Sequence, residues 1–144
     1  MALEDKKLPA DASAEEAVEA AIRVRLEEGR LSCPAAIDAA AELNLPASEV
    51  GQAADALRVR LTRCQLGLFG YPGHAKGWAA GGVTTLSVPA GFEDALRSAC
   101  DGEGRLGCAA LWREADRFGV PRLQAGFVAD RLGIPIHHCQ LGAF

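Results

Sequence analysis

The sequence predicts a mainly helical fold with a few short strands, arranged as two copies of one unit. The first observation is a repeat: residues 29–69 and 104–144 agree at 16 of 41 positions without a gap. The second is composition, because the 144-residue chain is 49% apolar and rich in alanine, which favours helices. The third is a glycine-rich interruption between the copies, at residues 70–91. A gapless repeat of this length indicates a duplicated structural unit.

The repeat divides the chain into four segments. These are a charged lead-in expected to be flexible (1–12), the first unit (13–69), a glycine-rich linker or wing (70–91) and the second unit (92–144). Units of about 60 residues bury little apolar surface and are marginally stable alone. We therefore expect the two copies to pack on each other or on a partner.

The first unit begins with a predicted helix from Ser13 to about Glu28. Ser13 and Glu16 have the spacing of a capping box, and Gly29 is a suitable helix end. The apolar spacing predicts one buried stripe, made of Ala17, Val18, Ala21, Ile22 and Leu26. Residues 30–32 are a short connector or edge strand.

Two further helices are predicted in the first unit, over 34–43 and 46–57. Pro34 suits a first helical turn, and Asn44 tolerates the left-handed conformation that ends a helix. The apolar positions in 59–69 suit a short strand or hairpin that closes the unit.

The rest of the chain repeats this plan after the linker. Within the linker, Val83–Val88 is strand-like because it is rich in β-branched residues. The predicted helices of the second unit cover 92–100, 109–118 and 121–132. Gly119 stands where the first unit has Asn44, so both positions predict a tight helix end. A terminal strand follows.

The order helix, strand, helix, turn, helix, strand resembles a winged helix-turn-helix. The resemblance depends on two similar stretches, Ala40 to Val50 and Ala115 to Ala125, in which a small alanine lets two helices cross closely. It implies two tandem winged helix-turn-helix repeats, mainly α with small β wings. In DNA-binding members of this class, the third helix reads the major groove and the wing contacts phosphate.

Carried over residue by residue, the resemblance places a DNA-binding face on each unit. The expected contacts in the first unit are Ser48, Gln52, Arg58, Arg60 and Arg63. Those in the second unit are Arg122, Gln124 and Arg131, which are better suited to guanine and adenine edges. The leading interpretation is therefore a DNA-binding transcriptional regulator, whose two unequal units read an asymmetric site.

The charge of the chain limits this interpretation. The formal net charge is −4, so no strong field attracts a polyanion, and the arginines are equally consistent with ordinary solvated helix faces. A competing interpretation is a protein-interaction module, which binds a protein partner or a second copy of the chain without a basic face. Leu123 and Phe127 form an interaction patch if they are exposed, but we expect them to be buried.

Four of the five cysteines follow the repeat, as the pairs Cys33/Cys64 and Cys108/Cys139. We expect each pair to be close in space, and we interpret the four as compact hydrophobic residues with no metal or cofactor. The alternative is a thiolate site: a metal or iron–sulfur centre held across the two units, or a redox sensor. No Cys-x-x-Cys spacing supports that alternative, and Cys100 has no counterpart.

No catalytic constellation is present in the sequence. The linker lacks the phosphate-binding glycine patterns, and no Ser/His/Asp order or carboxylate pair suggests hydrolysis, so we predict that the protein is not an enzyme. No apolar run is long enough to span a membrane, and the first residues lack the apolar core of a signal peptide. We therefore expect no membrane partner and a cytoplasmic location.

Overall fold

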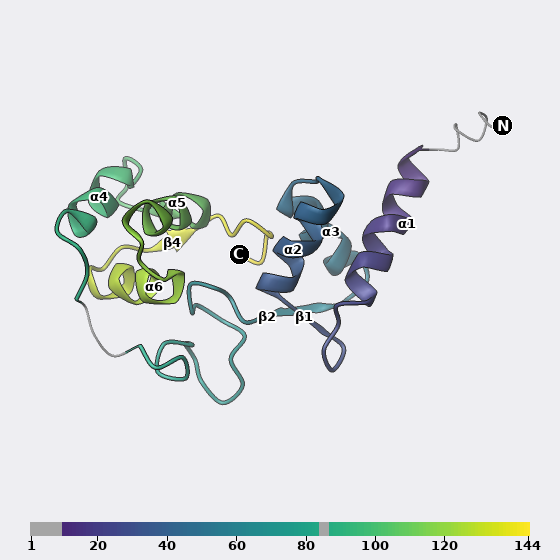
Figure 1. Cartoon of the computed structure of the whole chain (residues 1–144), viewed down its shortest axis with the longest axis horizontal. Coiled ribbons are helices and arrows are strands. Elements are labelled where there is room, and N and C mark those ends of the chain that lie inside the picture. The colour runs from purple at the N-terminus through teal and green to yellow at the C-terminus, as the bar shows by residue number, and fades with distance from the viewer. Residues whose placement is uncertain (1–9, 84–86) are drawn as a thin grey trace.

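The two halves of the chain lie side by side in the computed structural model, which describes residues 10–83 and 87–144 (Figure 1). The first half (10–69) contains α1 (Ala10–Arg23), β1 (Arg30–Ser32), α2 (Cys33–Leu43), α3 (Ala47–Ala56) and β2 (Arg60–Thr62). The second half (92–144) contains α4 (Phe92–Ala99), β3 (Leu106–Gly107), α5 (Cys108–Phe118), α6 (Arg122–Arg131) and β4 (Ile136–His137). The prediction of a mainly helical fold with small strands is confirmed.

The first helix differs from its prediction at both ends. It begins at Ala10, so Ser13 lies inside the helix rather than at its cap, and most of the predicted lead-in is outside the described residues. It ends at Arg23, several residues before the predicted stop. The chain then turns back on itself, with both Glu28 (φ 54°) and Gly29 (φ 77°) in the left-handed region.

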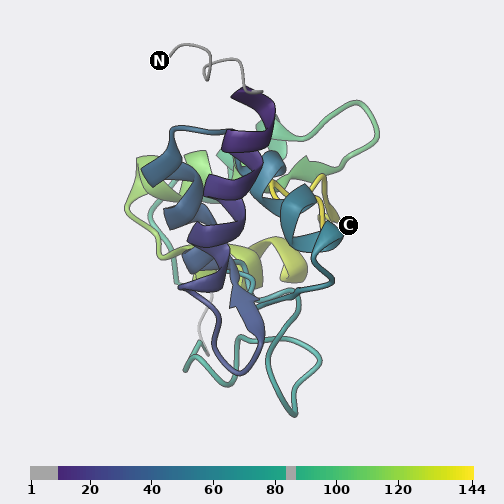
Figure 2. The ribbon, with the colours of Figure 1, turned by 90° about the vertical axis from the view of Figure 1, so that its right-hand side faces the viewer.

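The predicted stripe of α1 is buried apart from one residue. Val18, Ala21 and Ile22 are buried and Leu26 is half-buried, whereas Ala17 is exposed. Successive residues of a helix are about 100° apart, so Ala17 lies to one side of the narrow stripe centred near Val18. The stripe faces α2 and α3, and α1 covers the outer side of the first half (Figure 2).

Each half contains a helix–turn–helix pair, α2–α3 or α5–α6. The predicted helix ends are confirmed, because Asn44 (φ 58°) and Gly119 (φ 70°) are left-handed and donate their N–H groups to carbonyls of the preceding turn. The starts differ: the Ser32 hydroxyl accepts a hydrogen bond from the N–H of Ala35, whereas Gly107 offers α5 no side-chain cap.

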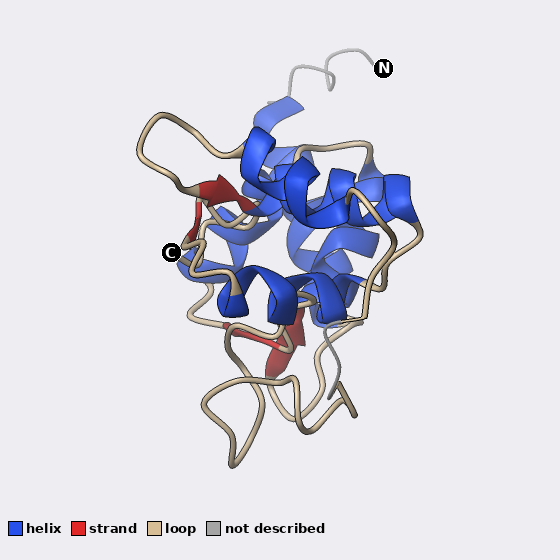
Figure 3. Cartoon of the chain, turned by 90° about the vertical axis from the view of Figure 1, so that its left-hand side faces the viewer, coloured by secondary structure: helices blue, strands red, loops and turns tan. Residues whose placement is uncertain are grey.

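The strands of each half pair in parallel, and the tandem winged-helix repeats are not confirmed. Arg30 lies opposite Arg60 in the pair β1–β2, and Leu106 lies opposite Ile136 in the pair β3–β4. The helix pair of each half is the crossover that a parallel pair needs. The two strand pairs lie apart (Figure 3). After β2 the chain folds back within residues 63–70, where the N–H groups of Arg63 and Cys64 donate to the carbonyl oxygens of Gly70 and Phe69, both at 3.1 Å.

One apolar core extends through both halves. Its fully buried side chains include Leu31 and Leu66 from the first half and Leu106 and Leu111 from the second. The linker (70–91) runs from the first half to the second (Figure 1). The strand predicted in it overlaps residues 84–86, which are outside the described residues. Among the described helices, none has the length and apolar character to cross a membrane.

Candidate functional site

A four-residue turn with the sequence Cys-Gln-Leu-Gly follows the last strand of each half. The first CQLG turn is Cys64–Gly67 and the second is Cys139–Gly142. In both, the glycine N–H donates to the cysteine carbonyl at 2.9 Å, and the glycine is left-handed, with φ of 83° and 80°. The conformation requires glycine at this place, which explains why the repeat keeps it.

The two CQLG turns are exchanged between the halves. A Cβ atom built on Gly126 of α6 would lie 1.9 Å from the Leu66 carbonyl oxygen of the first turn. A Cβ atom built on Gly51 of α3 would lie 1.8 Å from the Leu141 carbonyl oxygen of the second turn. Each turn therefore packs directly on a helix of the other half. This contact was not predicted from the sequence, although the repeat aligns the two helical glycines.

In the second half, the linker covers the outer face of α6. Trp78 is only 8% exposed, and its indole N–H donates to the Leu66 carbonyl oxygen at 2.8 Å. Its ring meets Phe127 edge-on at 5.6 Å, and the N–H of Gly77 donates to the Gly67 carbonyl oxygen at 2.8 Å. Leu123, which approaches Gly67 from α6, and Phe127 are half-buried, so they do not form an open patch.

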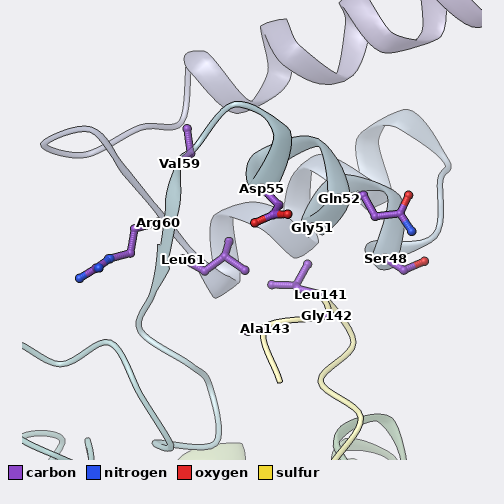
Figure 4. Close-up of a pocket in the computed structure, with 10 residues that line it drawn as sticks. All are labelled: Ser48, Gly51, Gln52, Asp55, Val59, Arg60, Leu61, Leu141, Gly142 and Ala143. Atoms are coloured by element: carbon purple, nitrogen blue, oxygen red, sulfur yellow. The ribbon is translucent and has the colours of Figure 1, made fainter.

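In the first half, the equivalent face of α3 is open. A groove of about 500 Å³ lies between α3, β2 and the second CQLG turn (Figure 4). Its wall includes Ser48, Gln52 and Gly142, which stand at the repeat positions of Leu123, Phe127 and Gly67. The open groove is therefore the counterpart of the place that Trp78 fills in the second half.

The residues predicted to contact DNA in the first half are all exposed to solvent. Ser48 and Gln52 are exposed and line the groove, as does Arg60. Arg58 and Arg63 are exposed as well, and both are left-handed, with φ of 61° and 51°. No ion pair in the described residues involves these three arginines.

Two of the three side chains predicted to contact DNA in the second half form hydrogen bonds within the protein itself. Arg122 donates to both carboxylate oxygens of Asp116, at 2.8 and 3.2 Å, and to the Gln65 side-chain oxygen at 3.1 Å. Its guanidinium also lies 3.7 Å from the centre of the Trp112 ring. These bonds hold the pKa of Asp116 below its ordinary value.

The other two predicted contacts on α6 differ from each other. The Gln124 side chain donates to the Ser87 carbonyl oxygen of the linker at 2.8 Å. Arg131 is exposed, with its guanidinium 5.0 Å from the centre of the Phe127 ring. Of the three, only Arg131 extends over open surface.

The four repeated cysteines line one small void between the halves: Cys33, Cys64, Cys108 and Cys139. The cysteines of each pair were expected to be close in space, and the exchange of the turns brings both pairs to one place. Burial raises the pKa of the Cys33 thiol to about 11 and also raises the pKa values of Cys64 and Cys108, so these three are protonated at neutral pH. Within the described residues, no three His, Cys, Asp or Glu side chains are placed to hold a metal ion.

Comparison of the chain with models of protein families, with curated proteins and with solved structures found no match. The chain thus has two candidate sites, the open groove on α3 and the cysteine void between the halves.

Proposed function

We propose that this protein is a docking module, in which the open groove of the first half binds a short turn of a partner protein. One observation carries the proposal: the counterpart groove in the second half already holds such a segment, the linker turn around Trp78, in which the N–H groups of Gly81 and Val83 donate to the Trp78 carbonyl oxygen. Because the two grooves share their backbone plan, the linker indicates the kind of ligand that the open one accepts.

The linker meets its groove through two hydrogen bonds, from the Trp78 indole N–H and the Gly77 backbone N–H. The corresponding acceptors in the open groove are the carbonyl oxygens of Leu141 and Gly142. Neither accepts a backbone hydrogen bond from the described residues. We therefore expect a partner segment with an aromatic N–H donor next to a small residue.

The walls of the open groove determine how the partner segment differs from the linker. Ser48 and Gln52 replace Leu123 and Phe127, so the open groove offers hydrogen bonds where the filled one offers apolar surface. The partner's residues beside the aromatic ring are therefore expected to be polar. The helix–turn–helix order of each half supports the resemblance to winged helix-turn-helix proteins, and such a scaffold can dock proteins without a basic face.

The test is a titration with a labelled peptide of residues 74–83, HAKGWAAGGV, measured by fluorescence anisotropy. We expect weak saturable binding to the wild-type protein. Ser48→Leu/Gln52→Phe, which copies the second half, tightens binding at least about tenfold through added apolar contact. Ser48→Arg/Gln52→Arg, which fills the groove, abolishes it.

Glu49→Arg is the matched control, because Glu49 is exposed on the same helix but does not line this groove. It is expected to bind the peptide like the wild type. A peptide in which alanine replaces the tryptophan is expected not to bind. Binding that survives Ser48→Arg/Gln52→Arg, or no binding of the peptide at millimolar concentration, refutes the docking proposal.

DNA binding is the second candidate, favoured by the exposed arginines of the first half. Arg58, Arg60 and Arg63 take part in no described ion pair, and the parallel register adds the exposed Arg30 opposite Arg60. Such a group can contact consecutive phosphates while Ser48 and Gln52 face the bases. According to this second candidate function, the first half contacts DNA and the second half does not.

The DNA candidate is tested with a random-sequence duplex at about 50 and 200 mM salt. The triple variant Arg58→Ala/Arg60→Ala/Arg63→Ala is expected to weaken binding and to reduce the salt slope by about three. Arg131→Ala, an exposed arginine of the second half, is the control. Absence of salt-sensitive binding by the wild type removes this candidate.

A further inference from the structure

The four repeated cysteines meet where the two halves join. Cys33 and Cys108 are the first residues of α2 and α5, so both lie at helix ends that favour negative charge. Cys64 and Cys139 are the first residues of the two CQLG turns. Each half thus supplies two thiols to one void, and the repeat relates them pairwise.

N–H donors surround these sulfur atoms. The Gln65 side-chain nitrogen lies 3.9 Å from Cys33 Sγ, and the Gln140 side-chain nitrogen lies 3.5 Å from Cys108 Sγ. The backbone N–H groups of the same glutamines also point to these sulfurs. The backbone N–H groups of Leu66 and Leu68 lie near the Cys64 sulfur. A neutral thiol is a weak acceptor, whereas such donors are typical partners of metal-bound thiolates.

The wall of the void also contains a buried donor without an acceptor. Trp112 lines the void and is only 9% exposed. Its indole N–H has no hydrogen-bond partner in the described chain. A buried unpaired N–H is unfavourable, so it indicates an acceptor that belongs to the site. A sulfide or thiolate beside the ring would supply one.

We propose that Cys33, Cys64, Cys108 and Cys139 bind a four-iron, four-sulfide cluster between the two halves. A single ion requires all its sulfur ligands about 2.3 Å from one point, and the described thiols are not placed that way. A four-iron cluster accepts thiolates that are farther apart, because each cysteine binds a different iron. The helix ends at Cys33 and Cys108 oppose the negative charge of the bound cluster.

Binding requires side chains to move, because the free volume is about 10 Å³, room for about one water molecule. The movable part of the wall is Phe144, which is 50% exposed. Its outward movement opens the void to solvent and leaves Gln65 and Gln140 in place as donors to the sulfur atoms.

The cluster enters by ligand exchange, with no change in oxidation state. A preformed cluster with four mercaptoethanol thiolates meets four protein thiols. Each cysteine sulfur forms a bond to one iron as one mercaptoethanol leaves that iron, and the cysteine proton passes to the departing thiolate. Four thiols are consumed and four mercaptoethanol molecules are released, so atoms and charge balance.

The test is anaerobic transfer of that synthetic cluster to the whole protein, followed by gel filtration. We expect about four iron and four sulfide per chain, with the visible absorbance of a cluster. Single Cys→Ser variants at the four repeated positions are expected to retain less than half of the iron. Cys100→Ser is the matched control, because Cys100 has no repeat counterpart and its thiol donates instead to the Leu96 carbonyl oxygen.

Cys→Ala variants, compared by circular dichroism, separate loss of a ligand from loss of the fold. If they remain folded and still lose the iron, the cysteines are ligands. Equal iron in the wild type and in Cys33→Ala/Cys108→Ala overturns the proposal, as does stoichiometric Zn²⁺ binding by a wild type that takes up no cluster. The result is independent of the docking proposal, because no groove residue is altered.

Discussion

α3 and α6 have the same length, the same central glycine and the same CQLG turn packed on that glycine, but their outer faces differ. On α6, Leu123 and Phe127 lie under Trp78 of the linker. On α3, Ser48 and Gln52 line an open groove. The duplicated backbone therefore forms a groove beside each of the two helices. A few surface side chains determine whether the linker of the chain itself fills that groove.

The charged contacts of the halves differ in the same way. In the second half, Arg122 joins α6 to α5 through Asp116 and to the first half through Gln65. The repeat positions of Arg122 and Asp116 are Ala47 and Ala41, so the first half has no such contact. The second half is therefore tied down at the face where the first is free, which favours the first half as the binding surface.

The largest expected effect on stability comes from removing Trp78, the linker residue that covers α6. Trp78→Ala deletes a buried ring and its hydrogen bond to Leu66, so we expect the free energy of unfolding to fall by about 3 kcal/mol. Trp78→Phe keeps a ring but loses the N–H donor, and we expect a loss of about 1 kcal/mol. Urea denaturation followed by circular dichroism measures both. A loss below about 1 kcal/mol for Trp78→Ala would mean that the linker does not hold this groove closed.

The next effect comes from the exchanged turns. Gly126→Ala drives a Cβ atom into the Leu66 backbone, which is buried under Trp78, and we expect a loss of about 2 to 3 kcal/mol in the same assay. Gly51→Ala makes the same clash with Leu141, but the residues after Leu141 are exposed and can retreat, so we expect a smaller loss.

The control for the glycine variants is Gly102→Ala, because a Cβ atom there meets nothing within 4 Å and Gly102 is not left-handed. We expect it to remain within about 0.5 kcal/mol of the wild type. Equal losses for Gly51→Ala and Gly126→Ala would show that the two turns are held equally firmly, and the proposed asymmetry would then be wrong.

Local signals in the sequence predicted the helix–turn–helix pairs well. Asn44 and Gly119 ended their helices as expected, because a left-handed residue acts through its own backbone. A strand at residues 30–32 and its pairing with the strand that closes the unit were also predicted, but the parallel direction was not, since it depends on the path of the chain through the whole unit. The resemblance to a winged helix therefore predicted the helices, and its wing is not confirmed.

The sites depended on contacts between distant parts of the chain. The repeat predicted that Cys33 is near Cys64 and Cys108 near Cys139, whereas a meeting of all four was only the alternative, since no ligand spacing in the sequence supported it. That follows from the exchange of the CQLG turns, for which matching glycines at 51 and 126 were the only signal. The cover of α6 could not be predicted either, because its central residue, Trp78, lies in the linker outside the repeat.

The smallest expected effect concerns the ion pair that only the second half has. Hydrogen bonds from Arg122 lower the pKa of Asp116 below its ordinary value of 3.8. A carboxylate with a lowered pKa stabilises the fold above the ordinary value, and this contribution is lost as pH falls through the lowered pKa. Because the Asp116 side chain is 55% exposed, we expect Asp116→Asn to cost less than about 1 kcal/mol at pH 7.

The pH dependence separates this ion pair from simple packing. The stability difference between the wild type and Asp116→Asn should be constant from pH 7 to about pH 5 and should shrink below about pH 4, where the carboxylate takes up a proton. Asp130→Asn is the control, since Asp130 is exposed and joins no ion pair in the described residues. A difference that persists unchanged at pH 3 would mean that Asp116 supports Arg122 by shape rather than by charge. The contrast with Ala41 of the first half would then concern packing alone.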